Sequence, residues 1–239
     1  MDGFSYHNIF ETKGIEYIVI LSFFAILIPF WILLNRRVNV RQSVQKFLGT
    51  LTAGALKIPQ GLYFSKNHTW TFLERSGAAK VGIDDLLMHL TGPVKITPFA
   101  QSGDTISKGN LLADIDHNGK SLKILSPVSG EIISINPVLQ SNPEVLNQDP
   151  LKQGWICRIK PTNWIAETQT YYLAEKATAW TDEELVKIKD FLASTARGQN
   201  PGMQQLILQD GGELRDNTLS ELPKETWQDF QNRFLSHLD

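Results

Sequence analysis

The fold of this chain is decided by residues 114–130, which read DIDHNGKSLKILSPVSG. Short runs of alternating apolar and polar residues flank Asn118-Gly119, the strongest short-range pattern for a two-residue type I′ turn. Both residues of such a turn need a positive φ, which Asn and Gly tolerate best. We therefore predict a β-hairpin with Asn118-Gly119 at its tip and Gly119 at positive φ.

Further short motifs surround this hairpin. They are YFSKNHTW at 63–70, VGIDD at 81–85, SPVSG at 126–130, NPE at 142–144, Asn147, DP at 149–150 and GW at 154–155. In their order and spacing these motifs and the hairpin resemble the glycine cleavage H-protein, a lipoyl carrier, over residues 62–161. The resemblance implies a mainly-β barrel-sandwich hybrid of the lipoyl and biotinyl type, in which two small sheets enclose one core.

The hairpin departs from the family at its carrier residue. The resemblance implies a lipoyl lysine at the position of Gly119. The count gives this position both forward from residues 114–116 and backward from residues 126–127. Lys120 is the next residue, and a shift of one position in a strand turns a side chain to the opposite face. We therefore expect no lipoate, with attachment to Lys120 as the alternative. The candidates for contact with a partner protein are Asp116, His117, Asn118 and Gly119.

An apolar segment precedes the domain. Residues 15–34 read IEYIVILSFFAILIPFWILL, with Glu16 as their single charge. A helix of about 20 apolar residues crosses a hydrocarbon core of about 30 Å. Arg36, Arg37 and Arg41 follow the segment, and basic flanks stay in the cytoplasm. We predict an uncleaved single-pass anchor in the cell (inner) membrane, with residues 1–14 outside and the main domain in the cytoplasm.

Residues 35–61 are predicted to form a juxtamembrane linker. Apolar residues recur at helical spacing in its first half, which favours an amphipathic helix on a membrane or on a partner subunit. A simple linker is the alternative interpretation. The apolar positions are Val40, Val44, Phe47, Leu48 and Leu51.

Residues 162–239 lie beyond the resemblance and predict a small α/β extension. Residues 181–184, Thr-Asp-Glu-Glu, have the pattern of a capping box and predict the start of a helix. Residues 204–209 predict a strand, and Pro223 lies at the start of a last helix. The apolar stripe of that helix is Trp227, Phe230, Phe234, Leu235 and Leu238.

Composition and motifs exclude several classes of function. A net charge of −2 gives no electrostatic footprint for nucleic acid. Cys157 is the single cysteine, so no disulfide forms within the chain, and we expect a buried thiol. None of the five histidines is spaced as a metal ligand, and phosphate-binding loops and nucleophile elbows are missing from the sequence. We predict no catalytic residue, no metal site and no enzyme activity.

Three functions are compatible with this organisation of one transmembrane helix, an H-protein-like domain and an extension. The first is a non-catalytic, membrane-anchored accessory or scaffold subunit of a multi-subunit complex, with a respiratory electron-transport complex as one candidate. Its partners would be the other subunits and membrane lipid. The alternative is a lipoyl carrier using Lys120, which delivers acyl, aminomethyl or reducing equivalents to a membrane-associated enzyme. The third, an adaptor outside the cytoplasm like the lipoyl-like domains of membrane fusion proteins, requires the opposite topology.

Overall fold

The computed structural model describes residues 9–35, 50–199 and 214–237. The chain divides into two compact units, Met1–Ser43 and Val44–Asp239. Each unit is considered by itself.

The first unit contains helix α1 (Ile9–Asn35), which covers the apolar segment that the sequence predicts to cross a membrane. Its described side chains, at 17–31, are exposed. In the described residues no helix combines enough length with enough apolar character to pass through a bilayer. The predicted transmembrane helix is therefore not confirmed.

The second unit is built on two antiparallel sheets, as the sequence predicts. The larger sheet has the strand order β2-β3-β4-β10-β9-β6, and the smaller sheet has the order β5-β7-β8, so β8 is an edge strand. The strands of the larger sheet are β2 (Tyr63–Phe64), β3 (Thr69–Leu73), β4 (Ala79–Ile83), β10 (Cys157–Pro161), β9 (Gly130–Ile135) and β6 (Thr105–Ile106). Those of the smaller sheet are β5 (Lys95–Pro98), β7 (Leu111–His117) and β8 (Lys120–Leu125).

Helix α3 (Asp85–Thr91) has a capping residue at each end, Asp84 before it and Gly92 after it. The side chain of Asp84 accepts a hydrogen bond from the backbone N–H of Leu87 at 2.8 Å, which caps the first turn. Gly92 ends the helix at φ 66°. Other short helices of this unit are η1 (Ala53–Ala55), α4 (Val138–Ser141), α5 (Val145–Gln148) and α6 (Trp164–Thr168).

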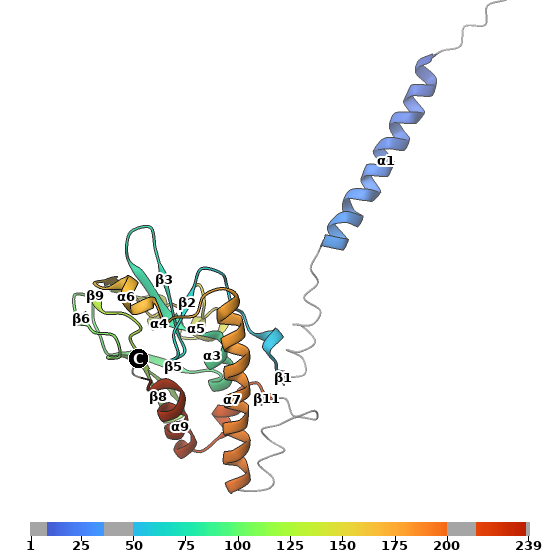
Figure 1. Ribbon diagram of the computed structural model, residues 1–239. Coiled ribbons are helices and arrows are strands. Elements are labelled where there is room, and N and C mark those ends of the chain that lie inside the picture. The colour runs from blue at the N-terminus through green and yellow to red at the C-terminus, as the bar shows by residue number, and fades with distance from the viewer. Residues whose placement is uncertain (1–8, 36–49, 200–213, 238–239) are drawn as a thin grey trace, which may run out of the picture. The chain divides into compact units, whose positions relative to one another are not determined.

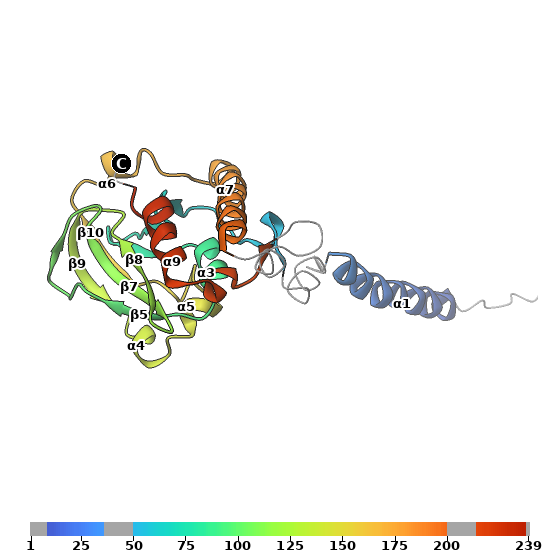
Figure 2. The same ribbon diagram turned by 90° about the horizontal axis from the view of Figure 1, so that it is seen from below.

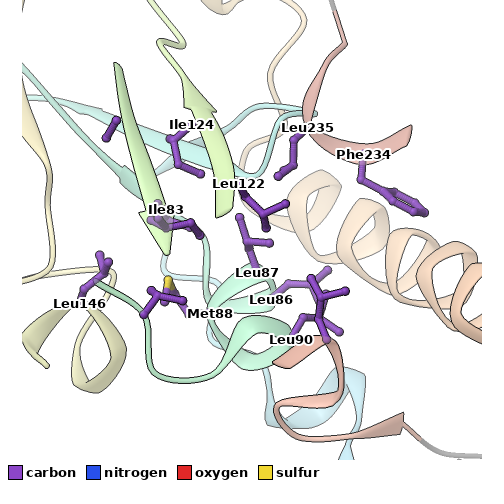
Figure 3. Close-up of a cluster of buried hydrophobic side chains, with 14 of the residues drawn as sticks. Ile83, Leu86, Leu87, Met88, Leu90, Leu122, Ile124, Leu146, Phe234 and Leu235 are labelled. Atoms are coloured by element: carbon purple, nitrogen blue, oxygen red, sulfur yellow. The ribbon is translucent and has the colours of Figure 1, made fainter. Parts of the chain in front are cut away.

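The main hydrophobic core joins the sheets, α3 and the C-terminal part of the chain. Figure 3 shows Leu122 and Ile124 of β8 in one cluster with Leu87 of α3 and with Leu235. All four side chains are buried. The C-terminal extension is therefore part of the same core as the domain that the family motifs predict.

The C-terminal elements in the described residues are mostly helical. Figures 1 and 2 both show α9 (Lys224–Phe230) beside β8, and the two elements are in contact. Strand β11 (Leu214–Arg215) pairs antiparallel with β1 (Thr50–Leu51), so Leu51 lies in a strand and not in the predicted amphipathic helix. The other positions of that helix, the predicted strand at 204–209 and Leu238 lie outside the described residues. The elements are α7 (Glu175–Gln199), β11 (Leu214–Arg215), η2 (Thr218–Glu221), α9 (Lys224–Phe230) and η3 (Gln231–Leu235).

The predicted capping box at 181–184 does not start a helix. Helix α7 begins at Glu175, so Thr181 lies inside it and its hydroxyl donates to the carbonyl of Ala177 at 2.8 Å. Ala177 and Trp180 are buried on the core side, and this packing extends the helix upstream of the box. The prediction was wrong because burial of an earlier apolar face outweighed the local capping pattern.

Candidate functional site

The hairpin of β7 and β8 has the predicted tight turn. Asn118 and Gly119 have φ values of 53° and 82°, as a type I′ turn requires. The predicted positive φ of Gly119 is therefore confirmed. The backbone N–H of Gly119 donates to a carboxylate oxygen of Asp116 at 3.3 Å, which closes the turn from inside.

Side chains alternate between the two faces of β8, so the Lys120 side chain points to one face of the hairpin and does not extend from its tip. Leu122 and Ile124 are buried, while Ser121 and Lys123 are exposed. Lys120 is half-buried and shares the inward face with Leu122 and Ile124, because successive residues of a strand point to opposite faces. The structure thus places the amine nearest to the tip on the core side of the hairpin.

The ammonium of Lys120 contacts the C-terminal part of the chain. Its Nζ donates hydrogen bonds to the backbone carbonyls of Ser220 and Leu222, the second at 3.1 Å. Nζ also lies 5.7 Å from the centre of the Trp227 ring. Two carbonyl oxygens and an aromatic face replace much of the water that an exposed ammonium would bind. In this conformation the amine is not presented at the tip.

His117 is the second polar side chain that is held beside the turn. Its Nδ1 lies 2.6 Å from the carbonyl oxygen of Pro93, which can only accept, so Nδ1 carries the proton. Its Nε2 then accepts from the side-chain amide of Asn118 at 3.2 Å. The imidazole stacks on the Trp227 ring, with centroids 6.3 Å apart. Of the candidate partner contacts, Asn118 and Gly119 remain exposed, whereas His117 is engaged within the chain.

A glutamine attaches the C-terminal segment to the edge of β8. The backbone N–H of Lys123 donates to Oε1 of Gln231 at 2.7 Å, and Nε2 of Gln231 donates to the Lys123 carbonyl at 3.3 Å. Sequence reasoning did not connect Gln231, Trp227 or Ser220 with the hairpin. The apolar stripe predicted that Trp227 is buried, but no pattern in the sequence identifies the hairpin of β7 and β8 as the surface against which it packs.

Two histidines of the domain, the partly buried His89 and the buried His68, have raised pKa values. Burial would lower the pKa of His89, but hydrogen bonds to Asp216, at 2.7 Å, and to Asp85 outweigh it and raise the pKa to about 9. Burial likewise opposes protonation of His68, and the neighbouring Asp84 carboxylate at 2.8 Å raises its pKa overall. Both ion pairs hold elements together: His89 joins α3 to the segment after β11, and His68 joins the β2–β3 turn to the cap of α3.

Cys157 lies in the core, as the sequence predicts. Its side chain is fully buried, and burial raises the pKa of its thiol to about 12. The thiol is therefore protonated and shielded at neutral pH. Among the described residues, no group of three or more His, Cys, Asp or Glu side chains is arranged to hold a metal ion.

Comparisons with known proteins identify the family. The family model described as glycine cleavage H-protein matches residues 62–184, just over half of the chain. A probable glycine cleavage system H protein of Thermococcus kodakarensis is 35% identical over 113 residues, which cover 47% of this chain and 84% of the relative. The glycine cleavage system H protein of Psychrobacter cryohalolentis is 33% identical over 119 residues, which cover 50% of this chain and 94% of the relative.

A crystal structure of a glycine cleavage system H protein from Mycobacterium marinum aligns with 53% of this chain and 99% of its own, at a TM-score of 0.46 and 21% identity. The sequence relatives are matched over most of their own length. The region that the family model matches contains both sheets and the hairpin of β7 and β8. This chain belongs to the glycine cleavage H-protein family.

Proposed function

We propose that this chain is a lipoyl carrier of the H-protein type, with Lys120 as its attachment residue. The observation that carries the proposal is that the chain belongs to a family of lipoyl carriers and keeps the tight hairpin of β7 and β8. Lys120 is the first residue of β8 and supplies a primary amine directly after the turn. Its chemistry fits amide attachment, although its direction differs from that of a residue at the tip.

Loading requires Lys120 to act as a nucleophile. The ammonium must leave the carbonyls of Ser220 and Leu222 and lose a proton to solvent. The amine nitrogen would then attack the carbonyl carbon of an activated lipoyl ester, so that an amide bond forms and the bond to the leaving group breaks. When bound, lipoate would supply a dithiolane for acyl, aminomethyl or electron transfer, and the domain would supply its position.

A second candidate is a non-catalytic accessory subunit without lipoate. The observation that favours it is the engagement of Lys120 by two carbonyls and by the Trp227 ring, which leaves no free amine at the turn. The residue count that assigns the carrier position to Gly119 supports the same reading. Under this candidate, Asn118 and Gly119 would contact a partner protein, and the chain itself would not be an enzyme.

Association with a membrane is a further part of the proposal. The exposed apolar side chains of α1 between residues 17 and 31 support it, together with the basic residues Arg36, Arg37 and Arg41 that follow in the sequence. The other subunits of a membrane complex, a respiratory one among the candidates, would then be the partners on the cytoplasmic side. Extraction of native membranes at high pH tests this: an anchored chain stays in the pellet, and release into the supernatant would contradict anchoring.

The intact mass of the chain purified from its native host separates the two candidates. A carrier shows an adduct of lipoyl mass, which disappears in Lys120→Ala and persists in Lys123→Ala, a matched change at an exposed lysine of the same strand. An unmodified chain from cells whose other lipoyl proteins are fully modified would exclude the carrier and leave the accessory subunit.

A further inference from the structure

The contacts between the hairpin and the C-terminal segment extend along β8. At the start of β8, Lys120 donates to the carbonyls of Ser220 and Leu222. Further along, both backbone polar groups of Lys123 are bonded to the side chain of Gln231. These contacts join residues about a hundred positions apart in the sequence, so they are features of the folded chain and not of local structure.

The C-terminal segment that contacts β8 is also held in place by its own hydrogen bonds and by burial in the core. The indole N–H of Trp227 donates to the carbonyl of Leu219 at 2.7 Å, which links α9 to η2 beneath the lysine. Leu222 and Leu235 are buried in the main core. The carbonyls that accept from Lys120 therefore belong to a preorganised surface, and holding the amine there requires little further ordering.

We propose that residues 218–235 form a hairpin cap, which keeps the Lys120 amine from acylation until a loading enzyme or partner displaces it. The inference rests on the proposed carrier function for its biological purpose, but the cap itself is a property of this fold. A protonated amine bonded to two carbonyls has no lone pair with which to attack an acyl donor. Opening the cap frees the Lys120 amine from both carbonyls and exposes it to solvent and to the acyl donor.

Acylation with a water-soluble acetyl ester, read by mass spectrometry of peptides, tests the cap directly. Lys123 is an internal reference, because it is an exposed lysine on the same strand. In the unaltered chain we expect Lys120 to react about tenfold or more slowly than Lys123, since each factor of ten needs only about 1.4 kcal/mol of protection. Equal rates for the two lysines would overturn the cap.

Two glutamines of the same segment give a matched pair of variants. Gln231→Ala removes both bonds to Lys123 without opening the core, and we expect it to raise the rate at Lys120 severalfold. Gln228→Ala changes an exposed glutamine of α9 for which the structure describes no bond to β8, and should leave that rate unchanged. Circular dichroism checks that both variants fold. An unchanged rate in Gln231→Ala, or equal acceleration in both variants, would contradict a displaceable cap.

The introduced amine of Gly119→Lys serves as a reporter at the tip, where an added Cβ would have no atom within 4 Å. We expect it to react as fast as Lys123, and slow reaction there would show that the whole hairpin is shielded, against the proposal. A lipoate ligase with lipoyl donor is then offered to the same variants. Protection of Lys120 that Gln231→Ala relieves, without a lipoyl adduct on Lys120 in any variant, would support the cap and refute the carrier function. A lipoyl adduct on a Lys120 that reacts as fast as Lys123 would support the carrier function and refute the cap.

Discussion

Two neighbouring residues, Gly119 and Lys120, decide what this hairpin can carry. Gly119 is exposed at the turn with φ 82°, and space around it is open. Lys120 follows on the inward face, where its charge is bound by backbone carbonyls. A displacement of one residue along a strand thus converts an amine offered to solvent into one held against the protein.

Gly119→Lys should lower the free energy of unfolding by about 1 kcal/mol, because a side chain is strained at positive φ. It should also create an amine that a lipoate ligase modifies. Denaturant unfolding and intact mass measure the two effects. Gly77→Lys is the matched control, since Gly77 has the same φ of 82° and equally open surroundings in another turn. Equal modification of both variants would show that the hairpin is not what the ligase recognises.

Lys120→Met keeps the length of the side chain but removes the donor to Ser220 and Leu222. We expect it to lower the free energy of unfolding by about 1–2 kcal/mol, because the carbonyls lose a charged partner. Lys123→Met, at an exposed position, should change it by less than about 0.5 kcal/mol. Denaturant titration compares them, and equal effects would mean that the Lys120 contacts contribute nothing to stability.

At the scale of single elements, α3 is one of the elements that join the sheets to the C-terminal segment, where it contacts η2. Asp84 caps its start, and His89 near its end pairs with Asp216. The backbone N–H of Asn217 donates to the carbonyl of His89 at 2.7 Å. A Cβ added at Gly92 would lie 2.7 Å from Oδ1 of Asn217, so the end of α3 has room only for glycine.

The His89–Asp216 pair predicts how stability depends on pH. The pKa of His89 is about 9 in the folded chain and 6.5 in its ordinary state, so folding favours the protonated form. Its stabilisation is complete below pH 6.5 and is lost as pH rises through 9. Asp216→Asn should lower the pKa of His89 and flatten this decline. Asp229→Asn makes the same charge change at an exposed residue and should leave both the pKa of His89 and the decline in stability unchanged. Thermal unfolding of the two variants between pH 6 and 10 measures the difference. A decline of equal slope in both variants would contradict the assignment.

Elements that are fixed by neighbouring residues could be predicted from the sequence, and contacts between distant residues could not. The Asn118-Gly119 turn and the Asp84 cap depend on a few adjacent residues, and both are present. The start of α7 was mispredicted because burial of Ala177 and Trp180 extends the helix beyond the capping pattern. The acceptors for Lys120 are backbone carbonyls, which every residue carries, so no sequence pattern identifies them.

At the scale of the whole molecule, the C-terminal segment is a structural part of the H-protein-like domain. The family match ends at residue 184, yet Trp227 and Phe230 beyond it are fully buried in the core shared with both sheets. Strand β11 also pairs with β1 ahead of the domain. The family fold and the extension after it are therefore expected to unfold together.

Trp227→Ala should lower the free energy of unfolding by about 3–5 kcal/mol, because it leaves a large cavity and removes the bond to Leu219. Trp164→Ala should cost less, since Trp164 is only partly buried. Calorimetry should show one transition in the unaltered domain and a lower single transition in Trp227→Ala. Two separate transitions in the unaltered domain would show that the extension folds independently.

The pairing of Gln231 with Lys123 has a consequence for how copies of the chain behave toward one another. Strand β8 ends its sheet, and an uncovered edge strand is a template for intermolecular β-pairing. Gln231 occupies both outward backbone groups of Lys123, while η3 covers the apolar face that contains Leu122. A chain shortened before residue 218 would expose this edge together with its apolar neighbours. We therefore expect a chain shortened in this way to associate through the β8 edge, and the extension to prevent that association in the full chain.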